Sequence, residues 1–322
     1  MIITVTPNPS LDRTIELTSP LARGAVQRSV RTTDEPGGKG VNVSRALAAS
    51  GADTVAILPG GLDDPVFVAL RSRGVATVNL PIDARLRSNV TITEPDGTTT
   101  KINEPGPDLG GHAIALVDLI VEHAVSADWL VIAGSLPPGL PADFLAGVVH
   151  AVRVAHGDSA PRIAVDSSGE PFRQLLDSGV PVDLVKPNAE ELAEVVGGDP
   201  DVYETDRDAA VAGAHLLRAR GVGAVLLTLG SAGAILVDDD GAWFAAAPVI
   251  EALSTVGAGD SSLSGYLLAE TSGASAPRRL AQAVASGAAA ASLPGSVVPT
   301  LAQTHPEAIE VVPLSQARAV QA

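Results

Sequence analysis

Short apolar runs rich in β-branched residues alternate along this chain with longer stretches rich in Ala and Leu. A short apolar run is typical of a buried strand, whereas apolar residues that recur every three to four positions indicate a helix. The short runs predict strands at Ile2–Thr6, Thr54–Leu58, Trp129–Ala133, Arg162–Asp166, Leu184–Val185, Ala224–Thr228 and Ala234–Val237. The longer stretches predict helices at Val41–Ser50, Asp64–Arg73, Gly111–Ala124, Pro141–Ala155, Glu170–Asp177, Ala189–Val196, Asp206–Arg220, Asp260–Ser272 and Arg278–Ala291.

Strands that alternate with helices imply parallel pairing through right-handed crossovers, and hence a sheet that helices cover on both faces. We therefore expect an α/β fold with a central, mostly parallel sheet. Ligands bind such sheets beyond the carboxyl ends of the strands. Four polar motifs come directly after predicted strands and are expected to meet at one site: Gly134-Ser135, Asp166-Ser167, Lys186-Pro187-Asn188 and Thr228-Leu229-Gly230.

Two segments, residues 11–36 and 85–105, interrupt the alternation of strands and helices. Both have strand-like polar alternation, and the second contains an Asp96-Gly97 pair that is typical of a hairpin turn. Each segment is too short to fold alone, so we expect a small sheet that covers the site. The chain is then one α/β domain over 1–322, with this discontinuous small sheet as an appendage. The tail within residues 302–322 is polar and proline-marked and is expected to be poorly ordered.

Composition narrows the class of protein. Hydrophobic residues make up 46% of the 322 residues but aromatic residues only 2%, so Ala, Val and Leu must build the core. The chain has no cysteine, which excludes disulfides, thiolate metal sites and a cysteine nucleophile. The formal net charge of −16 disfavours nucleic acids and anionic membranes as partners. No apolar run approaches the roughly 18–20 residues that span a bilayer, and Met1-Ile-Ile-Thr-Val-Thr has no basic region, so a cytoplasmic protein is expected.

The segment Thr255-Val-Gly-Ala-Gly-Asp260-Ser joins a predicted strand region to a predicted helix. Backbone N–H groups of Gly257, Ala258 and Gly259 can converge there on an anion, which the partial positive charge of the helix N-terminus also attracts. Asp260 would stand beside that anion and take a proton from an incoming hydroxyl, which suits phosphoryl transfer to an alcohol. The alternative is an ordinary Gly-rich turn that an Asp caps.

A second Gly-rich element, Gly37-Gly-Lys-Gly-Val-Asn-Val-Ser-Arg45, opens a predicted helix near the N-terminus. Its glycines let the backbone approach a ligand, and Lys39 supplies a point charge for phosphate. The element is not a P-loop, because Gly40 rather than Ser or Thr follows the lysine.

Together these motifs resemble the ribokinase/PfkB sugar-kinase family, and within it the phosphofructokinase and tagatose-6-phosphate kinase branch. The further segments that carry the resemblance are Thr6-Pro-Asn-Pro-Ser-Leu-Asp12, Arg87-Ser-Asn89, Gly134-Ser-Leu-Pro-Pro-Gly139, Asp166-Ser-Ser-Gly169, Lys186-Pro-Asn-Ala-Glu-Glu191 and Thr228-Leu-Gly230. The resemblance implies a ribokinase-like three-layer α/β/α fold with a small β-lid over residues 11–36 and 85–105. It also implies a homodimer that pairs through this β-lid.

The resemblance also assigns roles to single residues. For the acceptor sugar phosphate these are Asp12, Gly38, Lys39, Asn42, Arg87 and Ser135, with Lys39 and Arg87 facing its phosphate. The neighbouring Arg85 leaves the assignment of Arg87 open by two residues. For ATP they are Lys186, Asn188, Thr228 and Gly230, together with Gly257 and Gly259. Glu191 and Asp166 would hold Mg²⁺, largely through water, and a monovalent cation such as K⁺ is a further candidate.

The implied reaction moves the γ-phosphoryl group of ATP to a hydroxyl of fructose 1-phosphate, with Asp260 as base. Fructose 6-phosphate and tagatose 6-phosphate remain alternative acceptors, and a non-catalytic sugar-phosphate sensor is the alternative of another class. With so negative a chain, the reaction requires the few cations to gather around one cleft. Two departures from the family pattern stand out: Arg13 follows Asp12, and the Ala/Ser-rich stretch from Ala283 to Ser292 has no asparagine.

Overall fold

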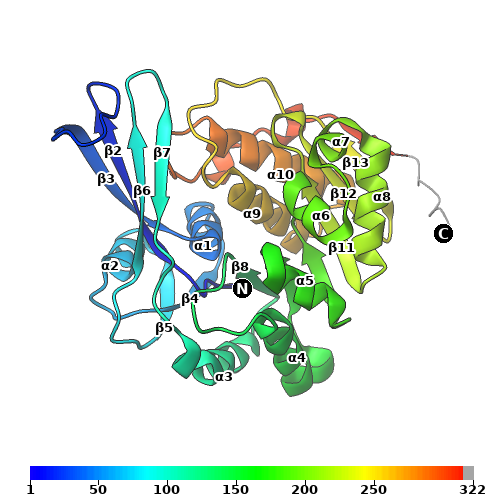
Figure 1. Cartoon of the computed structure of the whole chain (residues 1–322). Coiled ribbons are helices and arrows are strands. Elements are labelled where there is room, and N and C mark those ends of the chain that lie inside the picture. The colour runs from blue at the N-terminus through cyan, green and yellow to red at the C-terminus, as the bar shows by residue number, and fades with distance from the viewer. Residues whose placement is uncertain (315–322) are drawn as a thin grey trace.

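Ten strands form one large sheet, which we call the main sheet (Figure 1). The computed structural model describes residues 1–314. In spatial order the strands are β14 (Val311–Pro313), β13 (Gly241–Ala245), β12 (Ala234–Asp238), β11 (Val222–Thr228), β10 (Val182–Val185), β9 (Arg162–Asp166), β8 (Trp129–Ala133), β1 (Ile2–Val5), β4 (Thr54–Pro59) and β5 (Ala76–Leu80). Every pair from β5 to β11 is parallel, and β12, β13 and β14 pair antiparallel along one edge. The predicted mostly parallel sheet is confirmed.

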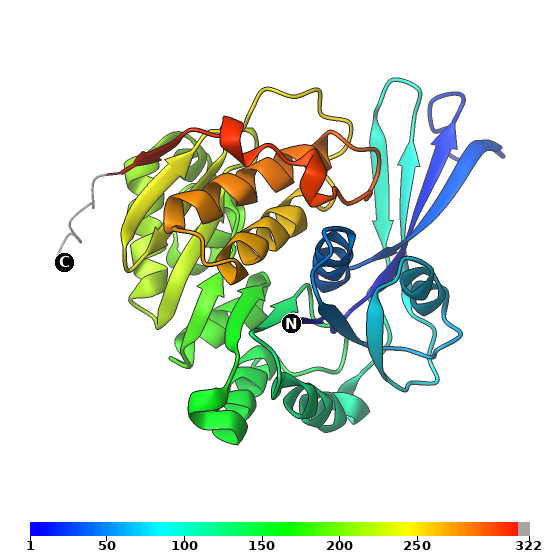
Figure 2. The ribbon, with the colours of Figure 1, turned by 180° about the vertical axis from the view of Figure 1, so that it is seen from behind.

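Helices cover both faces of the main sheet (Figures 1 and 2). One face carries α1 (Lys39–Ala49), α2 (Pro65–Ser72), α9 (Ala258–Thr271) and α10 (Ala276–Ala291). The other carries α3 (Ala113–Ala124), α4 (Phe144–His156), α5 (Gly169–Asp177), α6 (Ala189–Val196) and α8 (Arg207–Arg218). Alternate residues of each central strand enter the two cores: Ile132 faces α3 and α4, whereas its neighbour Val131 faces α1 and α9. The three-layer α/β/α prediction is confirmed.

Four elements were not predicted from the sequence: β5, β13, β14 and the short α7 (Pro200–Thr205). Strand β5 contains polar Thr77 and Asn79 and has only Leu80 fully buried, so its pattern lacks the apolar run of a central strand. Strand β14 lies within residues 302–322, the tail of which was expected to be poorly ordered. Residues 315–322, at the end of that stretch, lie outside the described residues, so the expectation stays a prediction. Short 3-10 helices occur at Gly110–His112, Gly157–Ser159, Gly230–Ala232, Leu301–Gln303 and Pro306–Ala308.

A separate four-stranded sheet, the small sheet, stands beside α1 at one end of the main sheet (Figure 1). Its order is β3 (Ser29–Gly37), β2 (Ser10–Leu17), β6 (Arg87–Thr93) and β7 (Thr99–Asn103). Strands β2 and β6 pair in parallel, and the other two pairs are antiparallel. Strand β3 ends one residue before Gly38, which caps α1, so the small sheet leads directly into the Gly-rich element.

Across residues 1–314, none of the helices combines the length and the apolar character that crossing a bilayer requires.

Candidate active site

A cavity of about 780 Å³ opens where the parallel strands of the main sheet end. We call it the main cleft. Its lining combines residues that are far apart in the sequence, from the start of α1 to α10. The lining residues that the sequence singled out are Lys39, Lys186, Asn188, Glu191, Thr228, Gly230, Ala258, Gly259 and Asp260. The motifs that follow β10 and β11 therefore meet at this cleft, as expected for the carboxyl ends of parallel strands.

The first turn of α9 forms one wall of the main cleft. Its N-cap is Gly257 at φ 75°, a left-handed conformation that favours glycine. Helix α9 begins at Ala258, two residues before the predicted start, so Asp260 lies inside the first turn and is not the cap. First-turn N–H groups have no intrahelical acceptor, which suits an anion. The Ala258 N–H closes a turn on the Thr255 carbonyl at 3.3 Å, which leaves Gly259 better placed to donate.

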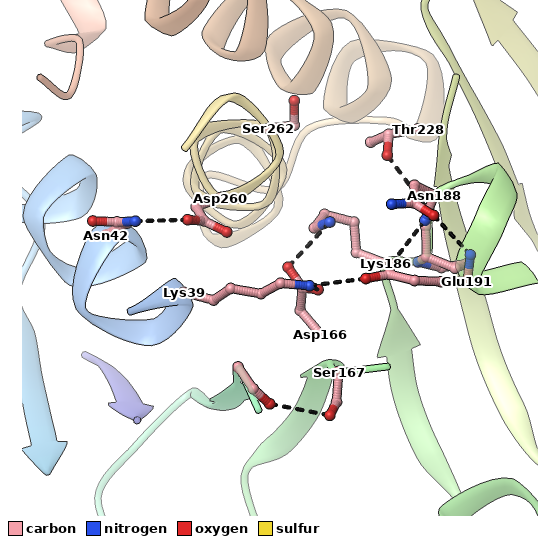
Figure 3. Close-up of polar contacts among 12 residues, drawn as sticks. Lys39, Asn42, Asp166, Ser167, Lys186, Asn188, Glu191, Thr228, Asp260 and Ser262 are labelled. Atoms are coloured by element: carbon pink, nitrogen blue, oxygen red, sulfur yellow. Dashed lines mark hydrogen bonds and ion pairs between the residues drawn. The ribbon is translucent and has the colours of Figure 1, made fainter. Parts of the chain in front are cut away.

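Asp260 is 7% exposed and accepts a hydrogen bond from Asn42 Nδ2 at 2.9 Å (Figure 3). Burial raises the pKa of this carboxyl, and the neighbouring Asp166 raises it further. The hydrogen bond from Asn42 and the two lysines of the cleft oppose that rise, and the pKa is about 6. A carboxyl with such a pKa is ionised at neutral pH and is still basic enough to accept a proton.

Two lysines and two carboxylates form a largely buried charge cluster at the cleft (Figure 3). Lys39 Nζ lies 2.7 Å from Asp166 Oδ1 and 3.0 Å from Glu191 Oε1. Lys186 Nζ lies 3.0 Å from the other oxygen of Asp166. Asp166 has no exposed surface. Burial alone would raise its pKa, but Lys186 and Lys39 together lower the pKa below the ordinary value. Burial likewise disfavours the charge on Lys39, yet Asp166 and Glu191 raise its pKa overall.

The Asn-x-x-Glu pair caps α6. Asn188 Oδ1 accepts from Glu191 N at 2.7 Å, and Glu191 Oε2 accepts from Asn188 N at 3.0 Å, which is a complete capping box. Only Glu191 Oε1 is directed at the lysine. Thr228 lies beside Asn188 through an isolated parallel bridge, and Gly230 follows on the same rim.

The acceptor-side candidates lie at the junction of the small sheet and the main sheet. Arg87 is half-buried and donates to the carbonyls of Asn8 and Glu104, both at 3.2 Å, whereas Arg85 is exposed. This difference favours Arg87 over Arg85. Asp12 Oδ1 accepts from Asn89 Nδ2 at 2.9 Å. Gly38, at φ 108°, packs so closely on Thr6 that a Cβ would lie 2.8 Å from its methyl group.

Arg87 and Ser135 line a neighbouring cavity of about 480 Å³, not the main cleft. Asn8 connects them, because it donates to Ser135 Oγ at 3.2 Å while its carbonyl accepts from Arg87. Gly134, next to Ser135, approaches the backbone of Lys39. The structure therefore brings Lys39, Lys186 and Asp260 into one cleft and places Arg87 in the neighbouring cavity. Lys101, another cation near the motifs, is exposed on β7.

Sequence reasoning missed the apolar wall of the main cleft. It consists of Val284, Gly287, Ala288 and Ala291 from α10, with the exposed Val249 and Ile250 from the loop opposite. The small residues of Ala283–Ser292 were the available signal: small side chains on one face of a helix leave room for a ligand. Asn8 was also missed. Only the structure shows that it is 4% exposed and that its Oδ1 has no hydrogen-bond partner among the described residues.

A family model for "pfkB family carbohydrate kinase" matches residues 6–302. The chain belongs to this family. It is therefore a phosphotransferase that acts on a sugar phosphate, and a kinase of this kind uses ATP and a divalent metal. Within 1–314 no group of three or more His, Asp or Glu side chains is arranged to hold a metal ion.

Named relatives agree with the family. A 1-phosphofructokinase of Haloferax volcanii is 38% identical over 97% of this chain and 99% of that protein. The ATP-dependent 6-phosphofructokinase isozyme 2 of Escherichia coli is 32% identical over 90% of this chain and 92% of that protein. A crystal structure of phosphofructokinase-2 from Escherichia coli in complex with potassium superposes with a TM-score of 0.84 at 30% identity, over 94% of this chain and 96% of that one.

Proposed function

We propose that this protein transfers the γ-phosphoryl group of ATP to the free primary hydroxyl of fructose 1-phosphate, giving fructose 1,6-bisphosphate and ADP. The observation that carries the proposal is Asp260, buried in the first turn of α9 with a pKa of about 6 and surrounded by Lys39 and Lys186. The Haloferax volcanii relative named 1-phosphofructokinase, which matches nearly end to end, supports the choice of acceptor.

Asp260 acts as the base. It removes the proton of the acceptor hydroxyl as the oxygen bonds to the γ-phosphorus and the bond to the ADP oxygen breaks. The leaving electron pair stays on ADP. Asn42 holds the carboxylate in place through its 2.9 Å hydrogen bond. A catalytically silent sensor would have no use for a buried carboxylate whose pKa is tuned in this way, which argues against that alternative.

The cations and the start of α9 stabilise the charge on the transferred phosphoryl oxygens. Lys186 Nζ lies close to Gly259, where a Cβ would come within 3.3 Å of it, so the ammonium and the first-turn N–H groups face the same space. Gly257, Ala258 and Gly259 supply the N–H groups. Asn188, Thr228 and Gly230 line the part of the cleft proposed for the nucleotide.

The acceptor is proposed to lie between the two cavities. Asp12 and Asn42 would bind its hydroxyls, and Gly38 would let the backbone approach. Arg87, Lys39 and Ser135 would contact its phosphate. The orientation of Lys39 toward Asp166 and Glu191 means that its ammonium must turn to reach that phosphate.

Asp166 and Glu191 fit a site for Mg²⁺. Both already bind a cation, the ammonium of Lys39, and Mg²⁺ prefers one or two carboxylates completed by phosphates and water. When bound, the ion would neutralise charge on the β- and γ-phosphates. K⁺ is a further candidate, supported by the Escherichia coli structure that contains potassium.

The second candidate acceptor is fructose 6-phosphate, favoured by the Escherichia coli 6-phosphofructokinase at 32% identity. Tagatose 6-phosphate belongs to the same class. An ADP-release assay with all three sugars tests the proposal. We expect kcat/KM for fructose 1-phosphate to exceed the others by more than about tenfold. A higher kcat/KM for either 6-phosphate would overturn the choice of acceptor, and absence of turnover with all three would overturn the function.

The small sheet is proposed as the contact of a homodimer. It exposes Val30 and Ile102, 62% and 57% exposed, on its two outer strands. Light scattering after gel filtration would measure a dimer, and Ile102→Lys would shift it toward monomer. A monomeric parent protein would overturn this part of the proposal.

A further inference from the structure

Arg45 lies on α1, three residues after Asn42, and has no role in the function proposed above. It is 4% exposed, which is rare for an arginine. Burial lowers its pKa, opposed mainly by the charge of Glu35, but an arginine keeps its proton at any physiological pH. A permanently charged group is therefore buried one helical turn from the residue that holds the base.

The guanidinium joins two parts of the molecule. Its Nη1 donates to Asn42 Oδ1 at 3.2 Å and to the Pro36 carbonyl at 2.9 Å. Its Nη2 donates to Glu35 Oε2 at 2.8 Å. Glu35 and Pro36 belong to β3 of the small sheet, and Asn42 donates in turn to Asp260 Oδ2 at 2.9 Å. A continuous chain of hydrogen bonds thus runs from the small sheet to the catalytic carboxylate.

We propose that Arg45 is a positioning residue: it fixes the Asn42 amide so that its NH₂ group faces Asp260, and couples that orientation to β3. The inference rests on the proposed role of Asp260 as base.

The two ends of an amide differ in chemistry but hardly in shape, so its neighbours decide its orientation. Asp260 accepts on one side of Asn42, and Arg45 donates on the other. Without the guanidinium, the buried Asn42 oxygen would have lost its donor, and the amide would be free to turn away from Asp260. A turned amide would present its oxygen to a carboxylate and repel it.

If Arg45 only anchored β3 through Glu35, losing another arginine that binds Glu35 should lower kcat by a similar factor. Arg73, the residue that follows α2, also donates to Glu35 Oε2, at 2.7 Å. Its other side-chain hydrogen bond is to the Ala69 carbonyl of α2. It anchors the same carboxylate of β3 without contacting Asn42. Arg73→Met therefore controls for the loss of one guanidinium from Glu35. The Arg73 side chain is 35% exposed against 3% for Arg45, so Arg45→Lys is needed as the second comparison at the buried position.

The experiment measures kcat and KM for both substrates in the two variants. We expect Arg45→Met to lower kcat by about tenfold or more, because a displaced base loses reactive geometry, with the KM for ATP unchanged. Arg73→Met should retain kcat within about twofold. The hydrogen bond from Asn42 lowers the pKa of Asp260, so its loss in Arg45→Met should raise that pKa. Asp166, Lys39 and Lys186 still face the carboxyl in this variant. The acid limb of the kcat profile should therefore move to higher pH.

Arg45→Lys covers the case in which Arg45→Met does not fold. An ammonium keeps the charge beside Glu35 but lacks the fork that reaches Asn42 at the same time, so kcat should still fall. Equal losses in the Arg45 and Arg73 variants, or a normal kcat in Arg45→Lys, would overturn the inference.

Asp260→Asn separates this inference from the proposed function. If Arg45 acts through Asp260, Arg45→Met should add no further loss of turnover in the Asp260→Asn background. A further tenfold loss there would overturn the inference alone. Parental turnover in Asp260→Asn would instead overturn the proposed base.

Discussion

The main cleft and the small sheet both carry ion pairs, but they bury their charges very differently. In the cleft, Asp166 is fully buried and shared between two lysines. On the small sheet, Arg13 and Asp34 form a bidentate ion pair, with side chains that are 45% and 41% exposed. The exposed pair stays largely hydrated, and its attraction stabilises the fold only weakly. The cluster in the cleft has lost most of its hydration, which costs free energy that its ion pairs must offset.

This difference indicates where function lies. Desolvated charges stabilise a fold poorly compared with apolar residues of the same size, so a cluster of them is better explained by the chemistry it performs. Arg13 is the opposite case, an exposed charge that a structural partner explains. Its charge was a departure from the family pattern, yet the structure pairs it with Asp34 within the small sheet.

The largest effect is expected from neutralising the carboxylate of Asp260 in the cleft. Asp260→Asn keeps the size of the side chain and one hydrogen-bonding oxygen. The amide cannot take the proton from the hydroxyl of the sugar phosphate. We expect turnover to fall at least ~100-fold, with substrate binding largely kept. Steady-state kinetics and calorimetric titration with ATP would measure both. Unchanged turnover would remove Asp260 from the mechanism.

Removing one cation from the cleft should cost stability. Lys186→Met leaves Asp166 buried with Lys39 as its remaining ammonium, and we expect the free energy of unfolding to fall by about 2–3 kcal/mol. Urea denaturation would measure it. Lys101→Met is the matched control, because this lysine is exposed on β7 and should change the free energy by less than about 0.5 kcal/mol. Equal effects in the two variants would contradict the contrast between the regions.

Asp260→Asn should also stabilise the folded protein, in a way that depends on pH. The folded pKa of about 6 exceeds the ordinary 3.8, so Asp260 contributes stability below pH 3.8 and loses it as the pH rises through 6. At pH 8 the variant should be more stable than the parent by about 1–3 kcal/mol, and the difference should shrink toward pH 4. A variant that is less stable at pH 8 would show that the ionised carboxylate is favourably held.

The same pKa predicts the pH dependence of the reaction. Because the base must be ionised in the free enzyme, kcat/KM for the acceptor should fall on the acid side of about pH 6, by about tenfold per pH unit. A pH profile of kcat/KM, with ATP saturating and the acceptor limiting, measures this. A flat profile down to pH 5 would contradict a base with this pKa.

The smallest effect is expected on the small sheet. Arg13→Ala removes an exposed ion pair and should change the free energy of unfolding by only about 0.5 kcal/mol, less at high salt. Denaturation at low and high salt would measure it. A loss above about 2 kcal/mol would mean that the small sheet depends on its charges as much as the cleft does.

The α/β class, the central strands and the motif residues all follow from the amino-acid pattern alone. Apolar runs such as Trp129–Ala133 have to be buried on both faces, and polar motifs at strand ends have to share one edge. The pattern could not supply β5 or β13, because short strands with mixed polarity have no distinctive period and are stabilised by their neighbours in the sheet.

The partners of each buried charge, in contrast, depend on the folded arrangement of the chain. That Lys39 binds Asp166 and Glu191, that Asp260 lies inside a helical turn with a raised pKa, and that Arg45 connects Asn42 to β3 all depend on contacts between residues far apart in the chain. Such contacts are set by the packing of whole helices and sheets. A local pattern names the residues, but their desolvation and their partners arise only when the fold closes around them.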